Sequence, residues 1–364
     1  MADQHFKIIS GGGLEWLQCA ALARIPWLIH AFSTRKGGFS RSPADPRGPK
    51  ALNLGAVNWD RPATVQINRQ MLLRQIGAAD FSLAMLRQIH SAEVFRAARG
   101  RVGQIEYRPA GLPGSLEFEA IPITAKTSAH SSQTEQAPDE TGRRTVKNRV
   151  ARGPVRRPVS TGMNPPGDAL LTDEPGILLS IRTADCLPIL LVDPKRRTIA
   201  AVHAGWRGAL AHIAEKAVGD MRREFCSRPD DLIAVIGPSI RRCCYEVQQD
   251  VVDAFEGRFA PSGFRQDLDE FFSEAPSSPG SSASEVPVSG FLASGPPGHG
   301  PQKAKAVHLD LVAVARYQLA RAGVPPAQVH VADFCTACRT DLFFSHRKEG
   351  SLAGRMMAVI GIRE

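Results

Sequence analysis

The chain has 364 residues, a length that allows one large domain or two, and 43% of them are hydrophobic. Its formal net charge of +9 is concentrated, because seven cations and no acid fall between residues 141 and 160. No aromatic residue that could stack on a base lies among these cations, so the charge favours a solvated basic loop over a nucleic-acid site. No apolar run approaches the roughly 20 residues that a membrane span requires. We therefore expect neither a nucleic-acid partner nor a membrane partner.

Two stretches have a composition that does not favour a packed structure. Residues 100–165 lack sustained hydrophobic periodicity, and 18 of the 26 residues in 276–301 are Ser, Pro or Gly. The rest of the chain is long enough to build one sizeable core. We predict a single domain over residues 1–364, interrupted by flexible insertions at about 100–165 and 276–301.

Over the first hundred residues, the patterns predict two strands, Trp27–Phe32 and Phe81–Ile89, and one helix, Asp60–Gly77. The polar, glycine-bearing loop after the first strand contains Arg35, whose planar guanidinium suits an anion. His90 follows directly after the second strand. A lone histidine at a strand end usually has a structural role, so its importance depends on its neighbours.

The central stretch predicts three buried strands, Ile177–Ile181, Pro188–Val192 and Thr198–Val202, followed by a helix over Ala209–Cys226. Cys186 lies in the break between the first two strands, and His203 lies where the third strand ends. Side chains at strand ends beside glycine turns are held by a rigid scaffold and stay open to a ligand. We expect this thiol and this imidazole to lie at the same edge of a sheet.

The last third predicts strands at Asp231–Ile236, Val329–Ala332 and Met356–Ile360 and helices at Tyr245–Phe259 and Leu309–Ala322. Strands and helices alternate without a strict βαβ rhythm, which indicates a mixed sheet. The sequence contains no GxxxxGK[ST] motif, no GxGxxG after a strand and no GxSxG. Three common cofactor-binding and hydrolase motifs are therefore excluded.

Two imidazoles and one thiol, on His90, Cys186 and His203, form the best chemical clue in the chain. They could hold Zn²⁺ at three tetrahedral corners and leave the fourth open, as in catalytic zinc sites. The same ligand types suit copper, and a histidine could instead activate Cys186 as a nucleophile. A buried cysteine with two structural histidines is the remaining alternative.

The seven cysteines are Cys19, Cys186, Cys226, Cys243, Cys244, Cys335 and Cys338. An odd number in a long chain, behind an N-terminus without the parts of a signal peptide, favours reduced thiols and a cytoplasmic location. Cys335-x-x-Cys338 alone is weak evidence for a metal or redox pair. Cys243 and Cys244 could complete a four-thiol site with it, but unlinked reduced thiols are the simpler expectation.

Eight segments occur in the order seen in one known family: STRKGGFS, ALNLG, the Asn68 and Arg69 pair, QIHSAEV, RTADCLPILL, AAVHAGWRG, IGPSIRRCCYEV and FFSHRKEG…GRMMAVIGI. The chain resembles the YfiH-like "laccase-domain" proteins, which are regarded as zinc-dependent purine nucleoside phosphorylases with adenosine deaminase side activity. The resemblance covers nearly all of 27–364 except the two insertions. It implies that His90, Cys186 and His203 are both the metal ligands and the catalytic residues. Ser91 departs from the family pattern, in which a glycine is usual.

The resemblance further implies an α+β fold, a YfiH-like single domain with mixed sheets in α/β/β/α layers. The implied substrates are phosphate and purine nucleosides (adenosine, inosine, guanosine and S-methyl-5'-thioadenosine), and Arg35, Arg207 and Arg347 are candidates to bind phosphate. The implied cofactor is zinc, with copper as the alternative, in a monomer or homodimer. The competing functions are a copper-dependent polyphenol oxidase (laccase) and a cysteine or metal hydrolase that acts on cell-wall precursors.

Overall fold

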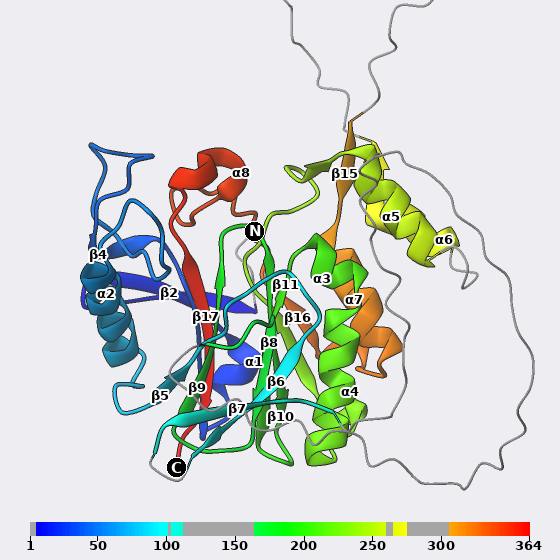
Figure 1. The fold of residues 1–364 in the computed structure, drawn as a ribbon, viewed down its shortest axis with the longest axis horizontal. Coiled ribbons are helices and arrows are strands. Elements are labelled where there is room, and N and C mark those ends of the chain that lie inside the picture. The colour runs from blue at the N-terminus through cyan, green and yellow to red at the C-terminus, as the bar shows by residue number, and fades with distance from the viewer. Residues whose placement is uncertain (1–4, 101–102, 112–163, 260–264, 275–305) are drawn as a thin grey trace, which may run out of the picture.

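The computed structural model describes residues 5–100, 103–111, 164–259, 265–274 and 306–364. Two large sheets lie face to face, and helices cover their outer faces (Figure 1). Helix α2 (Pro62–Gln75) packs outside one sheet, and α4 (Ile213–Phe225) and α7 (Leu311–Arg321) pack outside the other. The predicted α+β fold with mixed sheets in α/β/β/α layers is therefore confirmed.

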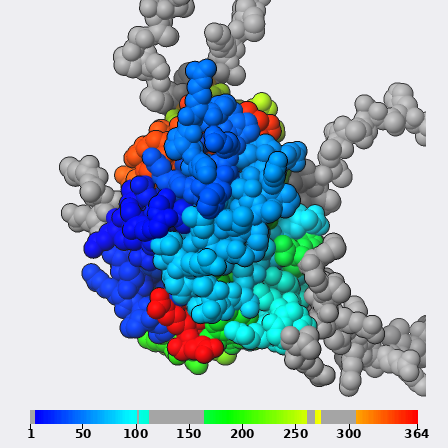
Figure 2. All heavy atoms as spheres, turned by 90° about the vertical axis from the view of Figure 1, so that its left-hand side faces the viewer, coloured from blue at the N-terminus to red at the C-terminus, as the bar shows by residue number. Residues whose placement is uncertain are grey.

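The six-stranded sheet has the order β1-β2-β3-β17-β9-β5. Its strands are β1 (Phe6–Gly11), β2 (Leu14–Cys19), β3 (Leu28–Ser33), β5 (Ser82–Ala84), β9 (Ile177–Thr183) and β17 (Met356–Ile362). The pairs are antiparallel except that of β5 with β9, which is parallel. Figure 2 shows the outer side of this layer, where residues from the first part of the chain form most of the surface.

The seven-stranded sheet has the order β16-β12-β10-β11-β8-β6-β7. Its strands are β6 (Val94–Arg99), β7 (Ile105–Pro109), β8 (Ala169–Thr172), β10 (Leu187–Asp193), β11 (Thr198–Ala204), β12 (Ile233–Ile236) and β16 (Val329–Val331). Strands β12 and β16 are parallel neighbours although almost a hundred residues separate them in the sequence. This pairing brings the loops that follow both strands to the same end of the sheet.

The smaller elements complete the described fold. A three-stranded sheet contains β13 (Glu246–Val247), β15 (Val307–Leu309) and β14 (Phe272–Glu274), and β4 (Lys36–Ser40) is a separate short strand. The remaining helices are α1 (Ala20–Ala23), α3 (Trp206–Leu210), α5 (Gln249–Phe259), α6 (Arg265–Phe271) and α8 (His346–Glu349), with 3-10 turns at Pro229–Asp231, Pro326–Gln328 and Gly350–Leu352. No helix of the described ranges is long and apolar enough to cross a membrane.

The main core lies between the two large sheets, and β10 shows why its sequence is continuously apolar. Leu190 and Val192 point into the core between the sheets, whereas Leu187, Ile189 and Leu191 point outward under α4 and α7. Both faces of the strand are therefore covered, so every position from Leu187 to Val192 is apolar instead of every second one. This rigid central strand begins one residue after Cys186.

Several predicted boundaries were wrong. The predicted strand Phe81–Ile89 ends at Ala84, so His90 lies in a loop and not at a strand end. The predicted helix Ala209–Cys226 is two helices, α3 and α4, which are separated at His212, a residue with a left-handed φ of 58°. The predicted helix Tyr245–Phe259 begins only at Gln249.

The two predicted insertions are only partly covered by the described residues. Strand β7 lies within the range 100–165 and pairs with β6, so a part of that range belongs to the seven-stranded sheet. Residues 112–163 and 276–301 lie outside the described residues. The insertions there, and the single domain that they interrupt, stay predictions.

Candidate active site

The structure brings His90, Cys186 and His203 together. Each offers one ligand atom, and these atoms lie within 4.8 Å of one another. Cys186 Sγ is 3.7 Å from His90 Nε2, and the two imidazole rings are 5.0 Å apart between centroids. The antiparallel register of β10 with β11 pairs Pro188 with His203, which places Cys186 and His203 at the same edge of the sheet, as predicted.

Asp168 positions the His90 loop. Its carboxylate accepts backbone N–H bonds from Ile89 (3.3 Å), His90 (3.1 Å) and Ser91 (2.6 Å), and the Ser91 hydroxyl donates a further bond of 2.7 Å. His90 itself has a left-handed φ of 59°, which a non-glycine residue adopts only when its surroundings hold it there. The hydroxyl of Ser91 thus adds one hydrogen bond to this support, which a glycine at this position could not supply.

Asp168 also fixes His203. His203 Nδ1 lies 2.8 Å from Asp168 Oδ1, and both side chains are buried. With Nδ1 donating its proton to the carboxylate, Nε2 is left as the ligand atom, an arrangement typical of metal-binding histidines. Burial alone would raise the pKa of Asp168, but the hydrogen bonds from His203 and Ser91 outweigh it and lower the pKa.

Cys186 and His203 favour each other's charged forms. Burial acts against the thiolate, but the charge of His203 and hydrogen bonds from both histidines lower the pKa of Cys186 to about 6. Burial also acts against the imidazolium, but Cys186 and Asp168 raise the pKa of His203 to about 9. The sulfur is therefore held in the deprotonated form that a metal ion requires.

Glycine at position 205 allows this close approach. A Cβ atom on Gly205 would lie 2.7 Å from His90 Cδ2 and 3.2 Å from Cys186 Sγ. Only a residue without a side chain fits at the start of α3 while the two ligands remain in place. The donor set, its spacing and this cradle fit a single metal ion with ligand bonds of roughly 2.0–2.3 Å.

Asp185, which precedes Cys186, is held from the other side of the site. It has a left-handed φ of 87°, and its carboxylate accepts bonds from Thr336 Oγ1 (2.6 Å), Ser345 Oγ (3.1 Å) and the Arg347 backbone N–H (2.7 Å). The turn that presents the thiol is therefore anchored to the segment that leads into α8.

Two of the three predicted phosphate-binding arginines, Arg207 and Arg347, lie within electrostatic range of Tyr245, as Cys186 also does. Arg347 lies over the Tyr245 ring, and Arg207 is exposed at the start of α3. Burial, and then the negative charge of Cys186, raise the pKa of Tyr245, whereas Arg347 and Arg207 oppose the rise. The phenol therefore stays protonated at neutral pH within electrostatic range of Cys186. Tyr245 was predicted to begin a helix, but it lies in the loop before β13, and its place near Cys186 was not predicted from the sequence.

Arg35 has different surroundings. Its guanidinium pairs with Glu349 at 2.8 Å, donates to the Thr340 carbonyl at 2.9 Å and lies over the Phe344 ring. It lines an open pocket of about 750 Å³, and none of the three ligand residues is among the described residues that line this pocket. Its charge is already neutralised by a carboxylate.

Three further arginines, Arg69, Arg182 and Arg355, form a cluster that the sequence analysis missed. Each is half-buried and donates to a backbone carbonyl, and no carboxylate of the described ranges forms an ion pair with any of them. Burial lowers the pKa of Arg69, and the positive charge of Arg182 lowers it further. The pKa of Arg182 is lowered in the same way, first by burial and then by the charge of Arg355. Burial lowers the pKa of Arg355, against the attraction of Cys186 and Asp185. Clustered guanidinium groups without acidic partners favour an anionic ligand.

Several known proteins are similar to this chain in sequence. A family model described as multi-copper polyphenol oxidoreductase laccase matches residues 29–274 and 288–363. Purine nucleoside phosphorylase YlmD of Bacillus subtilis is 32% identical over 93% of this chain and 89% of its own length. Purine nucleoside phosphorylase YlmD of Geobacillus stearothermophilus is 36% identical, but the match spans only 54% of this chain and 60% of that relative. A protein named adenosine deaminase RL5, from an unknown prokaryotic organism, is 34% identical over 52% of this chain and 59% of its own length.

Solved structures show the same fold. The crystal structure of YlmD from Geobacillus stearothermophilus is similar with a TM-score of 0.62 and 27% identity, over 98% of this chain and 99% of that one. The structure of the Bacillus licheniformis hypothetical protein YfiH has a TM-score of 0.65 at 23% identity, over 98% and 99% of the two chains. The family model and the Bacillus subtilis relative show that the chain belongs to the laccase-like family that includes YlmD.

Proposed function

We propose that this protein is a zinc-dependent purine nucleoside phosphorylase with adenosine deaminase side activity. The observation that carries the proposal is a three-ligand cluster whose histidine His203 is fixed by a buried carboxylate. Relatives named purine nucleoside phosphorylase and adenosine deaminase support the reaction class. As substrates we propose phosphate with adenosine, inosine, guanosine or S-methyl-5'-thioadenosine, in a cytoplasmic monomer or homodimer.

His90, Cys186 and His203 would hold the zinc ion and leave one coordination position for a ligand. When bound, zinc supplies a Lewis acid beside the reacting groups. Asp168 keeps His203 in the tautomer that presents Nε2, and it holds the His90 loop through backbone N–H groups. These contacts fix the ligands before any substrate arrives, which is the condition for electrostatic stabilisation of a transition state.

In phosphorolysis, a phosphate oxygen forms a bond to the anomeric carbon, and the bond from that carbon to the purine nitrogen breaks. The purine leaves with the electron pair and takes up a proton, which gives the free base and a ribose 1-phosphate. Positive charge develops on the sugar and negative charge on the base, so cations that hold phosphate against the sugar lower the barrier. The protonated phenol of Tyr245, which lies within electrostatic range of Cys186, would supply a further hydrogen-bond donor.

For phosphate we propose Arg207 and Arg347 together with Arg182 and Arg355. The first two flank Tyr245, and the electrostatic influence of Cys186 reaches Arg355. Arg35 was also predicted from the sequence, but its ion pair with Glu349 makes it the weakest of these proposals. An arginine that must first give up a carboxylate has less free energy to offer an anion.

A copper-dependent oxidation of phenols is the second candidate, because the matching family is described as a multi-copper laccase. A multicopper site needs several clusters of histidines. Among the described residues, only His90 and His203 belong to a group that could hold a metal ion. A cysteine or metal hydrolase that acts on cell-wall precursors is the third, since the Cys186 thiolate paired with the His203 imidazolium is also a nucleophile.

One experiment separates these functions. Adenosine and inosine are incubated with the purified protein while phosphate is titrated from zero and oxygen consumption is recorded. We expect base release that saturates with phosphate, forms ribose 1-phosphate and is unchanged under nitrogen. Base release at a rate independent of the phosphate concentration would establish a hydrolase, and oxygen uptake with a phenol would establish the oxidase.

A further inference from the structure

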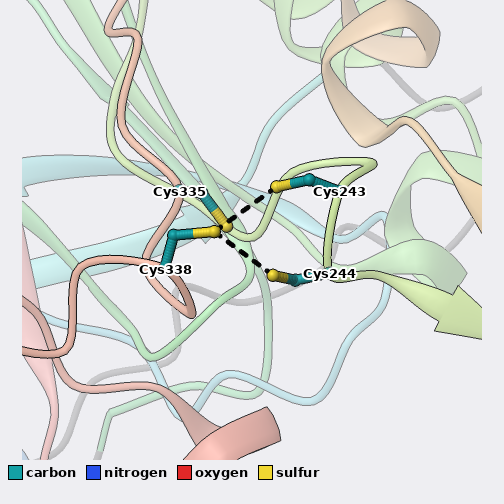
Figure 3. A group of neighbouring side chains, drawn as sticks. All are labelled: Cys243, Cys244, Cys335 and Cys338. Atoms are coloured by element: carbon teal, nitrogen blue, oxygen red, sulfur yellow. Dashed lines mark hydrogen bonds between the residues drawn. The ribbon is translucent and has the colours of Figure 1, made fainter. Parts of the chain in front are cut away.

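Four cysteines form a second cluster, which the proposed reaction does not use. Cys243 and Cys244 lie on the loop after β12, and Cys335 and Cys338 lie on the loop after β16. Figure 3 shows the four side chains pointing toward one another from these two loops. All four sulfur atoms lie within 4.8 Å of one another, and no other side chain type belongs to the group.

The sulfur separations fit one small metal ion. Cys338 Sγ is 3.6 Å from Cys243 Sγ and 3.4 Å from Cys244 Sγ. Four thiolates at about 2.3 Å from a tetrahedral ion lie about 3.8 Å apart, close to these values. A four-iron cluster binds each thiolate to a different iron atom and holds the sulfurs further apart.

A disulfide pair does not account for the arrangement. All four cysteines are free, and a disulfide requires a sulfur separation near 2.05 Å. A single disulfide would use two of the four thiols, and Cys338 has two near-equivalent neighbours, Cys243 and Cys244. A shared central ligand uses all four sulfurs at once.

Backbone contacts hold the two loops together around the sulfurs. Thr336 N–H donates to the Ser239 carbonyl at 3.0 Å, and Arg241 N–H lies 3.4 Å from Cys335 Sγ. Backbone N–H bonds to sulfur are the usual outer support of thiolate metal sites. The parallel pairing of β12 with β16 brings the loops together, so the cluster is organised before a metal binds.

We propose that Cys243, Cys244, Cys335 and Cys338 bind one Zn²⁺ ion in a closed, structural site that is separate from the His90, Cys186 and His203 centre. Four protein ligands leave no position for a substrate, so the ion has no catalytic role. Its effect is to clamp the loops after β12 and β16. Both loops also hold Asp185: Ile240 N–H donates to its carbonyl at 2.9 Å, and Thr336 Oγ1 donates to its carboxylate. The clamp therefore supports the turn that presents Cys186.

The test is a metal count on the protein purified from zinc-supplemented cells. We expect two zinc ions per wild-type chain, one in the Cys335→Ser/Cys338→Ser variant and one in the Cys186→Ala variant. Cys226→Ser, which removes an exposed cysteine outside both clusters, should keep two. Equal zinc in wild type and in Cys335→Ser/Cys338→Ser would overturn the proposal. If wild type held one zinc ion and only Cys335→Ser/Cys338→Ser lost it, the four-cysteine site would be supported, and the His90, Cys186 and His203 centre would be shown to hold no zinc.

A second measurement needs no variant. Intact wild-type protein is treated with iodoacetamide, with and without prior removal of metal by a chelator, and the modified cysteines are identified by mass spectrometry. We expect Cys243 and Cys338, whose side chains are exposed, to react at least tenfold faster after chelation, while Cys226 reacts equally in both samples. Equal rates for Cys243 and Cys338, or a disulfide between any of the four, would refute a resident ion.

Discussion

The His90, Cys186 and His203 centre and the four-cysteine cluster differ in how many ligands the protein supplies. The first offers three donors, of which His203 is buried and oriented by Asp168. The second offers four sulfurs from two surface loops. Three donors leave a position at which a substrate can bind, whereas four complete a tetrahedral shell.

The difference teaches which contacts matter around each site. An open centre needs buried partners behind its ligands because substrate must find those ligands already in place. A closed centre has no substrate to position, and its metal bonds add stability to loops that the fold has already brought together. Substitutions at the first should therefore change turnover, and substitutions at the second should change stability.

The largest effect on turnover should come from removing a ligand of the open centre, and removing ligands of the closed centre should affect stability instead. Cys186→Ala removes one of three ligands, and we expect kcat to fall more than about 1000-fold, the loss of at least about 4 kcal/mol of transition-state stabilisation. Cys335→Ser/Cys338→Ser should instead lower the thermal midpoint and keep kcat at 25 °C within about tenfold. Steady-state kinetics and calorimetry of both variants check this. Full turnover by Cys186→Ala would show that the assignment of the active site is wrong.

Asp168→Asn tests the carboxylate behind the open centre. The amide cannot both accept from the backbone N–H groups and take the Nδ1 proton of His203, so we expect metal affinity or kcat/KM to fall about 10–100-fold. Asp193→Asn is the matched control. Asp193 is also fully buried and accepts two backbone N–H bonds, but at the opposite end of the β10–β11 hairpin. Asp193→Asn should lower the thermal midpoint and leave the metal content unchanged. Equal metal loss in both variants would indicate a general effect of replacing buried aspartates.

A smaller effect, on the KM for phosphate, should distinguish Arg355 from Arg35. Arg355→Lys keeps the charge but loses the planar fork, and we expect the KM for phosphate to rise about tenfold at unchanged zinc content, or about 1.4 kcal/mol. Arg35→Lys keeps a cation opposite Glu349 and should leave the KM within about twofold. If the KM responds to Arg35 and not to Arg355, phosphate binds in the separate pocket that Arg35 lines.

The smallest effect is the change in the free energy of unfolding at mildly acidic pH. Acid would release metal from both clusters, and it would also protonate buried residues of the sheets. His30 is buried in β3, and its Nε2 accepts the Cys19 N–H at 2.9 Å; burial lowers the pKa of His30 to about 4, against 6.5 in the unfolded chain. Between these values the unfolded state binds the extra proton, so stability falls as the pH drops. We expect a loss of about 1 kcal/mol between pH 6.5 and 5.5 from this residue alone.

The measurement is urea unfolding of metal-free protein at both pH values, for wild type and His30→Gln. Glutamine can accept the same N–H and does not titrate, so the pH-dependent loss should shrink by about that amount. An unchanged slope in His30→Gln would assign the loss to other groups.

The sequence predicted the open centre because its ligands flank strands that are continuously apolar. Cys186 and His203 were predicted from the ends of β10 and β11. His90 was predicted at the end of a strand over Phe81–Ile89, but that strand ends at Ala84, so only its grouping with the other two residues holds. The four-cysteine cluster was only one possibility, since nothing local indicates that β12 pairs with β16. The partner of Arg35 is Glu349, 314 residues further along the chain, and such a contact cannot be read from spacing.

Strand β17 has a consequence for how the protein is made. It lies between β3 and β9 in the six-stranded sheet, yet it follows every other described strand in the sequence. Until β17 emerges from the ribosome, β3 and β9 each have one unpaired edge. A chaperone that binds exposed strand edges would therefore bind the chain before β17 is synthesised. The turn that presents Cys186 follows β9 and is subject to the same delay, because Asp185 in that turn is held by Ser345 and Arg347. Metal insertion at the open centre is therefore expected to be a late event, after translation of this chain has passed Ile362.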